Sequence, residues 1–266
     1  MTTMVNLAVS PVAADLAHHC LDGSIALVTG GTRGIGLATT IGLATLGATV
    51  VMVGSSTPRA EAVAEVLVAR GLDVIGVGVD LSDPDAVRAL PASLGALAAP
   101  DLLVLAAGVM SGPRTKTLRT EQSEWDRVLG INLGGVFSAV AAFGPAMTAR
   151  RSGRIVVLSA CLGRMSGPGT AGGLAPYRIS KAAVNALVRN LAAETGNGAR
   201  GVTVDAVCPG HCRTDMGGPD APRSAEDGAD SVLWLCTRDL GTRDLGTRKE
   251  TTPTGLLWED RTVVPW

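Results

Sequence analysis

Residues 25–36 read Ile-Ala-Leu-Val-Thr-Gly-Gly-Thr-Arg-Gly-Ile-Gly, an apolar run that ends in a glycine-rich turn. The Ala- and Leu-rich stretch 37–46 follows and is typical of a helix. We therefore predict a strand, a tight loop and a helix start, which direct backbone N–H groups and the positive end of a helix dipole toward a pyrophosphate. Gly30 would allow the turn, Gly34 would let the phosphates approach, and Gly36 would let the helix pack against the strand. A strand–turn–helix unit without a nucleotide is the alternative, because glycine triplets also occur there.

Length and composition indicate one globular α/β domain. The chain has 266 residues, of which 46% are hydrophobic and 18% charged, which is enough for a sizeable core. The formal net charge of -1 gives no electrostatic reason to expect nucleic acid or an anionic membrane as a partner. No continuous apolar run is long enough to span a bilayer, so no membrane association is expected.

The cysteines and the N-terminus predict a reducing, cytoplasmic location. Five scattered cysteines are an odd count, which does not resemble a disulfide framework. Residues 1–21 contain no Lys or Arg, whereas a secretory signal has a positively charged start, so no such signal is expected. Residues 1–22 are predicted to be a loosely held tail. His18-His19-Cys20 has no further ligands at a usual spacing, so no metal site is expected.

The end of the second apolar run, 48–53, predicts the cofactor. In a dinucleotide fold an acidic residue at this place favours NAD, whereas a basic residue nearby accommodates the 2′-phosphate of NADP. No acid lies between Val50 and Ser56, Ser55 offers a hydroxyl, and Arg33 of the glycine loop can reach the same place. These features favour NADP(H), although Arg33 could also be a solvated loop residue.

Apolar runs and amphipathic stretches alternate along the chain, which predicts a doubly wound parallel sheet in a three-layer α/β/α domain over residues 23–266. The end of the chain is interpreted as a last strand at 253–258 and an apolar tail at 263–266. The other predicted strands are 74–79, 102–106, 153–159 and 202–208, and the predicted helices are 59–70, 85–97, 121–147, 177–195 and 225–236.

Two segments near the C-terminus are interpreted as additions to this domain. Residues 211–224 are rich in Gly and Pro and follow a strand's carboxyl end, so a small lid is predicted at about 211–235. The unit Thr-Arg-Asp-Leu-Gly is repeated from residue 237, and 237–250 is interpreted as an expanded surface loop.

Four polar residues stand out as candidates for chemistry. Tyr177 and Lys181 are four residues apart on one helix, so both can point into one site, where the ammonium would lower the pKa of the phenol and make it a general acid. A packed Tyr with a solvated Lys is the alternative. Asn132 lies in an apolar helical stretch and is expected to hydrogen-bond backbone or to hold a water. Asp80 follows a strand and would meet a ligand there or cap a turn.

Taken in order, these motifs resemble those of the short-chain dehydrogenase/reductases over nearly the whole chain from Gly23, and the stretches 176–183 and 214–216 are most similar to the carbonyl-reductase-like members. The resemblance implies a single Rossmann-type domain. The motifs that carry it are Thr29-Gly30-x-x-x-Gly34-x-Gly36, Asp80-Leu81, Ala107-Gly108, Asn132, Ser159, Tyr177-x-x-x-Lys181 and Pro209-Gly210 with Thr214.

The resemblance implies a role for each motif. Tyr177 would donate a proton to a substrate carbonyl, Lys181 would lower the pKa of Tyr177 and hold the nicotinamide ribose, and Asn132 would hold the water of a proton relay. A serine would hydrogen-bond the substrate oxygen, and Ser159 is the candidate for this role. The residues implied to bind NADP(H) are Gly30, Thr32, Arg33, Gly34, Ile35, Gly36, Ser55, Asp80, Leu81, Ala107, Gly108, Tyr177, Lys181, Pro209, Gly210 and Thr214.

Two departures from the family pattern matter. Leu105 and Ala106 replace two Asn that usually precede Ala-Gly. Ala160 occupies the place of the usual catalytic serine, and Ser159 lies one residue early, which on a strand turns its side chain to the opposite face. Either the strand end is bulged and Ser159 serves, or Cys161 or Ser166 substitutes, or the contact is missing.

The sequence therefore supports two functions of different classes. The first is an NADP(H)-dependent reductase of a ketone or aldehyde, and a dehydratase or epimerase on the same fold remains open. The second is an NADP(H)-binding sensor or partner protein with weak or no turnover, which the Ala160 departure favours. By resemblance, the protein is expected to form a homodimer or homotetramer and to act on a small-molecule carbonyl or alcohol.

Overall fold

The structure, a computed structural model, describes residues 20–112, 116–239 and 253–266. Within these residues one eight-stranded sheet has the order β3-β2-β1-β4-β5-β6-β7-β8, and only β8 is antiparallel to its neighbour. The strands are β1 Ile25–Thr29, β2 Thr49–Gly54, β3 Val74–Gly78, β4 Leu102–Leu105, β5 Gly153–Leu158, β6 Val202–Val207, β7 Leu257–Glu259 and β8 Thr262–Val264.

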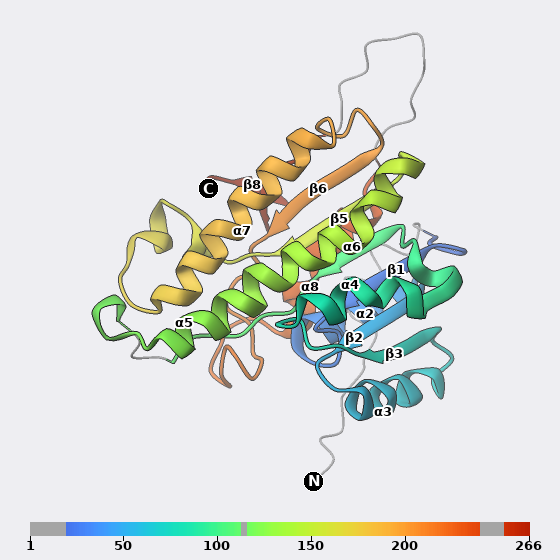
Figure 1. The fold of residues 1–266 in the computed structure, drawn as a ribbon, viewed down its shortest axis with the longest axis horizontal. Helices are drawn as coiled ribbons and strands as arrows, with labels where there is room; N and C mark the ends of the chain where they lie inside the picture. The colour runs from blue at the N-terminus through green and yellow to red at the C-terminus, as the bar shows by residue number, and fades with distance from the viewer. Residues whose placement is uncertain (1–19, 113–115, 240–252) are drawn as a thin grey trace.

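Helices cover both faces of the sheet (Figure 1). One core contains apolar side chains of α4, α6 and α7, and a second contains those of α2, α3 and α8. The predicted three-layer, doubly wound α/β fold is thus confirmed. The helices are α2 Gly34–Thr45, α3 Thr57–Val68, α4 Pro84–Leu94, α5 Gln122–Leu129, α6 Gly135–Arg150, α7 Ala175–Glu194 and α8 Ala225–Thr237.

The apolar runs form strands because both of their faces are buried. Successive residues of β1 alternate between the two cores, with Leu27 in the core of α4, α6 and α7 and Val28 in the other, and neither is exposed. A strand covered on both faces needs apolar side chains at every position, which explains continuous rather than alternating runs.

The C-terminal end differs from the prediction. Residues 263–266 were expected to be an apolar tail, but residues 262–264 form the strand β8. The last parallel strand is β7, Leu257–Glu259, and not 253–258. A tight turn at Asp260 and Arg261, both with positive φ, lets Val263 pair with Trp258 in an antiparallel hairpin. Residues 1–19 and 240–252, which include most of the predicted N-terminal tail and of the repeat loop, lie outside the described residues.

The predicted helix 121–147 is present but contains an irregular turn. A π-helical turn, Gly130–Gly134, joins α5 to α6 and holds Asn132. The combined run Gln122–Arg150 has 29 residues and is apolar enough, by length and composition alone, to cross a membrane, a test that core helices also pass. We expected no segment long and apolar enough to span a bilayer, because polar residues interrupt the apolar runs of this helix. Its side chains Val136, Phe143 and Met147 pack into the core.

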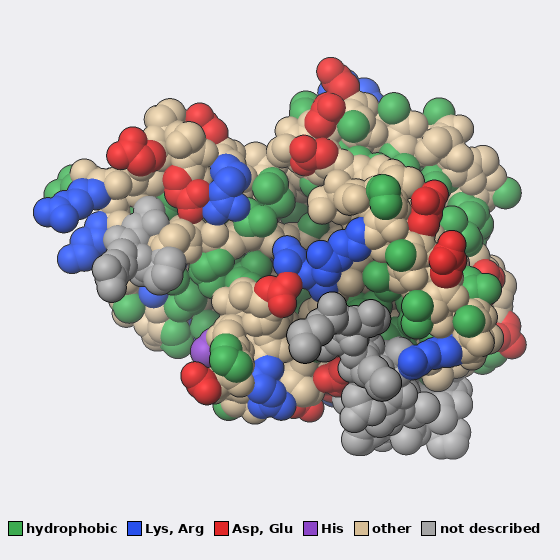
Figure 2. Space-filling view, turned by 90° about the horizontal axis from the view of Figure 1, so that it is seen from below, with side chains coloured by type: hydrophobic (Ala, Val, Ile, Leu, Met, Phe, Trp, Pro, Cys, Tyr) green, Lys and Arg blue, Asp and Glu red, His purple; other side chains and the backbone are tan. Residues whose placement is uncertain are grey.

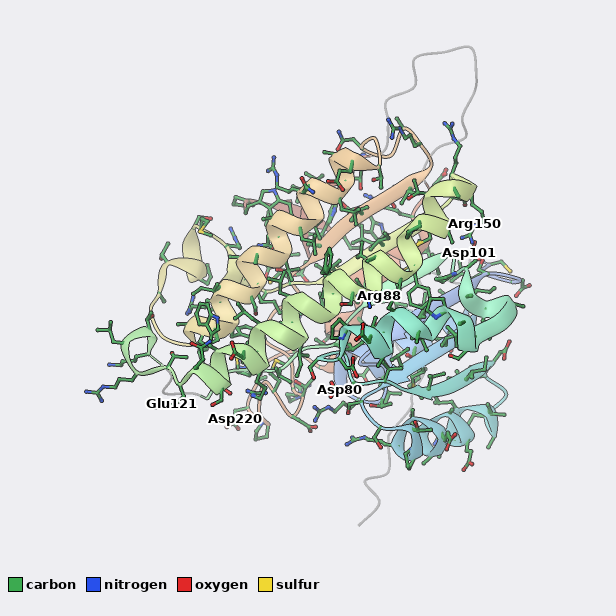
Figure 3. The ribbon with its side chains drawn as sticks, viewed as in Figure 1. Asp80, Arg88, Asp101, Glu121, Arg150 and Asp220 are labelled. Atoms are coloured by element: carbon green, nitrogen blue, oxygen red, sulfur yellow. The ribbon has the colours of Figure 1, made fainter. Side chains whose placement is uncertain are left out.

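The strand order reverses between β1 and β4, and ligands of such sheets bind at this switch point, beyond the carboxyl ends of the strands. Figure 3 shows Asp80 beyond β3 at that edge, whereas Asp101 and Arg150 lie at the opposite edge. Acidic and basic side chains are interspersed over the face shown in Figure 2.

Candidate active site

The glycine loop between β1 and α2 is built so closely that side chains do not fit. Gly30 has a φ of +67°, and a Cβ there would lie 2.7 Å from the Cα of Ala107. At Gly36 an added Cβ would lie 2.2 Å from the carbonyl oxygen of Gly30. Gly34, with a φ of +52°, opens α2 beside Thr214. Each glycine is therefore required by backbone conformation or by close approach. The turn at Gly30 and the close packing at Gly36 agree with the expectation, whereas the approach of phosphates at Gly34 stays a prediction.

A cavity of about 490 Å³ lies over this loop and is called the cofactor cavity below. Its size is within the range of small-molecule sites. Of the residues implied by the resemblance, Gly210 and Asn132 are not among its walls. Those that line it are Gly30, Thr32, Arg33, Gly34, Ile35, Gly36, Ser55, Asp80, Leu81, Ala107, Gly108, Ser159, Tyr177, Lys181, Pro209 and Thr214.

Arg33 is held at the cavity by a carboxylate. Its Nη1 atom lies 2.6 Å from Oδ2 of Asp215, which also lines the cavity, and both side chains are more than half exposed. Asp80 caps a turn, because its Oδ1 accepts hydrogen bonds from the N–H and hydroxyl of Ser82, and these bonds lower its pKa. A glycine cradle with an arginine and without an acid at the end of β2 fits a dinucleotide that carries a 2′-phosphate.

Tyr177 and Lys181 lie together in the inner wall of the cavity, on the first turns of α7. Their exposed fractions are 6% and 4%, which excludes the alternative of a solvated Lys. The Nζ atom of Lys181 lies 5.9 Å from the centre of the Tyr177 ring and donates a 2.7 Å hydrogen bond to the carbonyl of Leu158. The helix thus brings both predicted groups into one site.

The electrostatics of this pair differ from the expectation. Burial raises the pKa of Tyr177, and the nearby Cys161 and Cys208 add to that shift. Burial lowers the pKa of Lys181 to about 8. The pKa of Tyr177 is therefore raised and not lowered as the sequence predicted, because desolvation penalises the charged form of both groups. The phenol stays protonated at neutral pH.

Asn132 uses its amide to connect two segments of the site. Its Oδ1 accepts a 2.7 Å hydrogen bond from the N–H of Val109, and its Nδ2 donates to the carbonyl of Val109 and to Oγ of Ser180. The side chain is fully buried. Asn132 therefore joins the loop after β4 to α7. Of the two roles expected from the sequence, a bond to backbone or to a water, the structure shows the bond to backbone.

The end of β5 is regular, and Ser159 and Ala160 face opposite ways. The backbone of Ala160 is extended, and its methyl group packs against Tyr177. The hydroxyl of Ser159 instead donates to Oδ1 of Asn185 in α7, although Ser159 lines the cavity. This geometry gives no bulge that would turn the Ser159 hydroxyl toward Tyr177. Cys161 packs into the core beneath α7, and Ser166 lies in the next loop outside the cavity wall.

Ser111 is a polar residue of the site that the sequence did not reveal. It is 2% exposed, and its Oγ accepts a 3.1 Å hydrogen bond from the N–H of Tyr177. It lines a second cavity of about 780 Å³, the outer cavity, which shares Met110, Arg127, Asp215 and Met216 with the cofactor cavity. The remaining walls are Gly112, Glu124 and Leu174. Only its position shortly after Ala107-Gly108 could have drawn attention to it.

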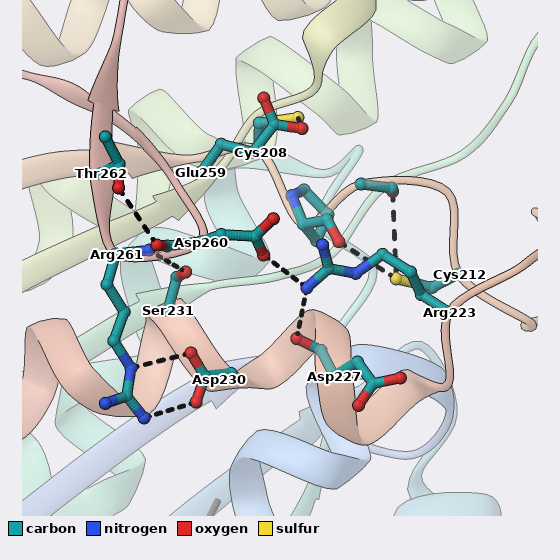
Figure 4. Close-up of polar contacts among 12 residues, drawn as sticks. Cys208, Cys212, Arg223, Asp227, Asp230, Ser231, Glu259, Asp260, Arg261 and Thr262 are labelled. Carbon is teal, nitrogen blue, oxygen red and sulfur yellow. Dashed lines mark hydrogen bonds and ion pairs between the residues drawn. The ribbon is translucent and has the colours of Figure 1, made fainter.

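The predicted lid approaches both cavities. Its residues Asp215 and Met216 line them, and the other end of the segment is anchored by Arg223, whose Nη2 lies 2.6 Å from Oδ1 of Asp260 in the β7–β8 turn (Figure 4). The same guanidinium donates to the carbonyl of Asp227 in α8. Movement of the segment remains a prediction.

A glycine cradle at the switch point of a parallel sheet, with a buried tyrosine and lysine beside it, defines a class of nucleotide-dependent oxidoreductases. Consistent with this, a family model described as short chain dehydrogenase matches residues 24–224. The chain belongs to the short-chain dehydrogenase family, as its motifs predicted.

Relatives and solved structures agree with this assignment. A 3-oxoacyl-[acyl-carrier-protein] reductase of Synechocystis is 36% identical over 198 residues, which cover 74% of this chain and 77% of that protein. A 3-oxoacyl-[acyl-carrier-protein] reductase of Staphylococcus aureus is 37% identical over 196 residues, 72% of this chain and 75% of that protein. A metagenomic short-chain oxidoreductase solved in complex with NADP is 32% identical, with a TM-score of 0.70 over 82% of this chain and 92% of that one. The expectation of NADP(H) agrees with that complex.

Proposed function

We propose that this protein is an NADP(H)-dependent oxidoreductase that interconverts a ketone or aldehyde and the corresponding alcohol. The observation that carries the proposal is the buried Tyr177–Lys181 pair at the end of a cavity whose other walls are the glycine loop and Arg33. A protonated phenol in the same cavity as a glycine loop suited to a dinucleotide supports carbonyl reduction.

NADPH, when bound, supplies the hydride. Tyr177 donates its phenolic proton to the carbonyl oxygen of the substrate, since its raised pKa keeps it protonated. Lys181 stabilises the phenolate that remains, and Asn132 holds the loop after β4 in place against α7. Arg33 would hold the 2′-phosphate in place of Asp215.

The relatives direct the choice of substrate. Those with 36% and 37% identity are named 3-oxoacyl-[acyl-carrier-protein] reductases rather than carbonyl reductases. Met110, Leu174 and Met216 give the outer cavity apolar walls, and Met110 and Leu174 also pack in the cluster that contains Tyr177. A ketone on an acyl chain, presented as a thioester, is therefore the first substrate class to test.

Ala160 favours a second candidate function. Its methyl group packs beside Tyr177, where the family usually supplies a hydroxyl to the substrate oxygen. Losing one such donor costs about a hundred- to a thousandfold in rate. An NADP(H)-binding sensor or partner protein with weak turnover is the function that this substitution supports.

We also propose that the protein is a homodimer or homotetramer. Phe137 on α6 is 59% exposed and Ile179 on α7 is 42% exposed, so two long helices carry large apolar side chains on the surface. Exposed apolar groups on neighbouring helices are typical of contacts between subunits. The molar mass in solution, measured by light scattering, tests this.

NADPH oxidation by the purified protein tests the enzymatic proposal. The panel should contain 3-oxoacyl thioesters, simple ketones, aldehydes and quinones, with Tyr177→Phe as the control. Turnover that falls at least about a hundredfold in the control supports a reductase with Tyr177 as acid. Tight NADPH binding without turnover favours the sensor, and a gain of activity in Ala160→Ser would then show that the missing hydroxyl was the limit.

A further inference from the structure

Two cysteines lie side by side at the catalytic edge of the sheet, and the proposed reaction uses neither. Strands β5 and β6 are parallel neighbours in which Leu158 pairs with Val207, and the N–H of Ser159 donates to the carbonyl of Val207. Cys208 directly follows β6, and Cys161 begins the short 3-10 helix Cys161–Gly163 after β5. Because neighbouring strands are about 4.8 Å apart, the two residues come together although 47 positions separate them.

The thiols interact as well as sharing an edge, because each shifts the pKa of the other through a side-chain hydrogen bond. The Cys208 thiol also donates to Glu259 on β7, with 3.5 Å between Sγ and Oε1 (Figure 4). Cys208 is 2% exposed, whereas Cys161 is half-buried. The pair thus consists of a buried residue and a partly exposed one, so we expect a small reagent to reach Cys161 first.

The surroundings favour charge on the outer sulfur. The hydrogen bond from Cys208 lowers the pKa of Cys161, and Arg164 and the N–H of Leu162 act in the same direction, whereas burial and Glu259 oppose them. The same bond raises the pKa of Cys208. A thiolate with a neighbouring thiol is the arrangement found where cysteines are oxidised reversibly.

The other thiols differ in this respect. Burial raises the pKa of Cys236 to about 12 and also raises that of Cys212. Cys20 is exposed and lies in the N-terminal segment away from the sheet edge. These cysteines provide internal controls in the same molecule.

We propose that Cys161 and Cys208 form a hydroperoxide-reactive thiol pair that closes to a disulfide at the edge of the active site. The Cys161 sulfur attacks one oxygen of a hydroperoxide, the O–O bond breaks, and the products are a sulfenic acid and an alcohol, or water from hydrogen peroxide. The Cys208 sulfur then attacks the Cys161 sulfur, the S–O bond breaks, and the hydroxyl leaves as water with the Cys208 proton. Two thiols lose two electrons in total, and the hydroperoxide gains them.

The disulfide would act on the site through charge and through the backbone. A negative charge on the Cys161 sulfur raises the pKa of Tyr177, and a disulfide does not carry that charge. It would also join the loop after β5 to the end of β6. Leu158 of β5 and Pro209, which lies just after β6, both line the cofactor cavity. The proposal goes beyond the proposed reductase, and its chemical test does not depend on turnover.

Peptide mapping after oxidation tests the pair. The full chain, with Cys212→Ser introduced to leave one cysteine in tryptic peptide 201–213, is treated with hydrogen peroxide at a small molar excess, alkylated and digested without reductant. We expect peptides 155–164 and 201–213 to appear joined and lighter by two hydrogen atoms, and to separate after reduction. Free Cys161 and Cys208 with oxidised Cys20 would overturn the proposal.

Two variants separate the roles of the sulfurs. In Cys208→Ser the sulfenic acid on Cys161 cannot be resolved, so labelling of residue 161 by dimedone should rise at least fivefold over the parent protein. In Cys236→Ser the joined peptides should form as before. If Cys208→Ser leaves the dimedone label at the level of the parent protein, Cys208 is not the resolving thiol and the proposed pair is wrong.

Discussion

The Nζ atom of Lys181 lies 5.9 Å from the centre of the Tyr177 ring, one turn further along α7, and both side chains are almost fully buried. Burial therefore sets the charge state of each group more than their attraction does: the pKa of Tyr177 is raised and that of Lys181 is lowered to about 8. The acid of the proposed reaction is neutral over the physiological range, and its cationic neighbour titrates just above that range.

This difference predicts the pH dependence of reduction. We expect kcat/KM to be level from about pH 6 to 7.5 and to fall above pH 8, since Lys181 then loses the proton that stabilises the Tyr177 phenolate. Initial rates of NADPH oxidation from pH 6 to 10 measure the profile. Lys181→Arg keeps its charge and should move any fall to higher pH. A wild-type fall centred near pH 10 would contradict the lowered pKa.

Lys181→Met should stabilise the protein at pH 7 while removing activity. The pKa of Lys181 falls from 10.5 in the unfolded chain to about 8 in the fold, so the unfolded state binds more protons between these values and wild-type stability rises with pH there. Below pH 8 the fold holds a costly buried charge. The variant should gain about 1–3 kcal/mol at pH 7, after loss of the bond to Leu158, and this gain should shrink between pH 8 and 10.5.

Urea unfolding at pH 7 and pH 9.5 measures that gain. Lys116→Met, at an exposed position, is the matched control and should change stability by less than about 0.5 kcal/mol. A Lys181→Met protein that is less stable than the wild type at pH 7 would show that the bond to Leu158 outweighs desolvation.

Arg33 and Asp215 should control NADPH affinity in opposite directions. Arg33→Ala removes the proposed partner of the 2′-phosphate and should weaken NADPH binding about tenfold or more, with little effect on NADH. Asp215→Asn frees Arg33 from an exposed ion pair, which is worth up to about 1 kcal/mol, so NADPH should bind up to about fivefold more tightly. Fluorescence titration measures both, with Asp220→Asn as the control in the same segment. Equal changes for NADPH and NADH would refute this role of Arg33.

Ser111 should contribute to turnover. Its Oγ holds the N–H of Tyr177 and lies in the wall of the outer cavity, so Ser111→Ala should lower kcat about tenfold and leave the NADPH dissociation constant unchanged. Steady-state kinetics and cofactor titration separate the two effects. Ser166→Ala, outside both cavity walls, should leave kcat as in the wild type. An unchanged kcat in Ser111→Ala means that the hydroxyl has no part in turnover.

The buried ion pair of Asp205 and Arg238 should matter more for stability than the half-exposed one of Asp101 and Arg150. The Arg238 guanidinium lies about 5 Å from the rings of both Trp234 and Trp258, and its Nη2 is 2.9 Å from Oδ2 of Asp205. Asp205→Ala leaves that cation buried without its partner and should cost about 3–5 kcal/mol.

Asp101→Ala at the opposite edge is the comparison. Its ion pair with Arg150 is 3.3 Å long and partly exposed, so the pair itself is worth up to about 1 kcal/mol. Urea unfolding of both variants measures the difference. Equal losses would mean that burial does not set the value of the Asp205–Arg238 pair.

The sequence by itself determined the features that depend on neighbouring residues along the chain. The apolar run 25–29 and the glycines at 30, 34 and 36 specify a strand, a turn and a helix start because backbone conformation and side-chain period are local properties. For the same reason the four-residue spacing of Tyr177 and Lys181 placed both on one face of a helix.

Tertiary structure decided what depends on contacts between distant segments. Burial in the wall of the cofactor cavity, and not spacing, sets the pKa of Tyr177. The regular end of β5 turns Ser159 toward Asn185 and leaves Ala160 in the cluster that contains Tyr177. Cys161 and Cys208 meet only because β5 and β6 pair. Desolvation and contacts of this kind depend on the packing of strands and helices far apart in the chain, and no local pattern of residues encodes them.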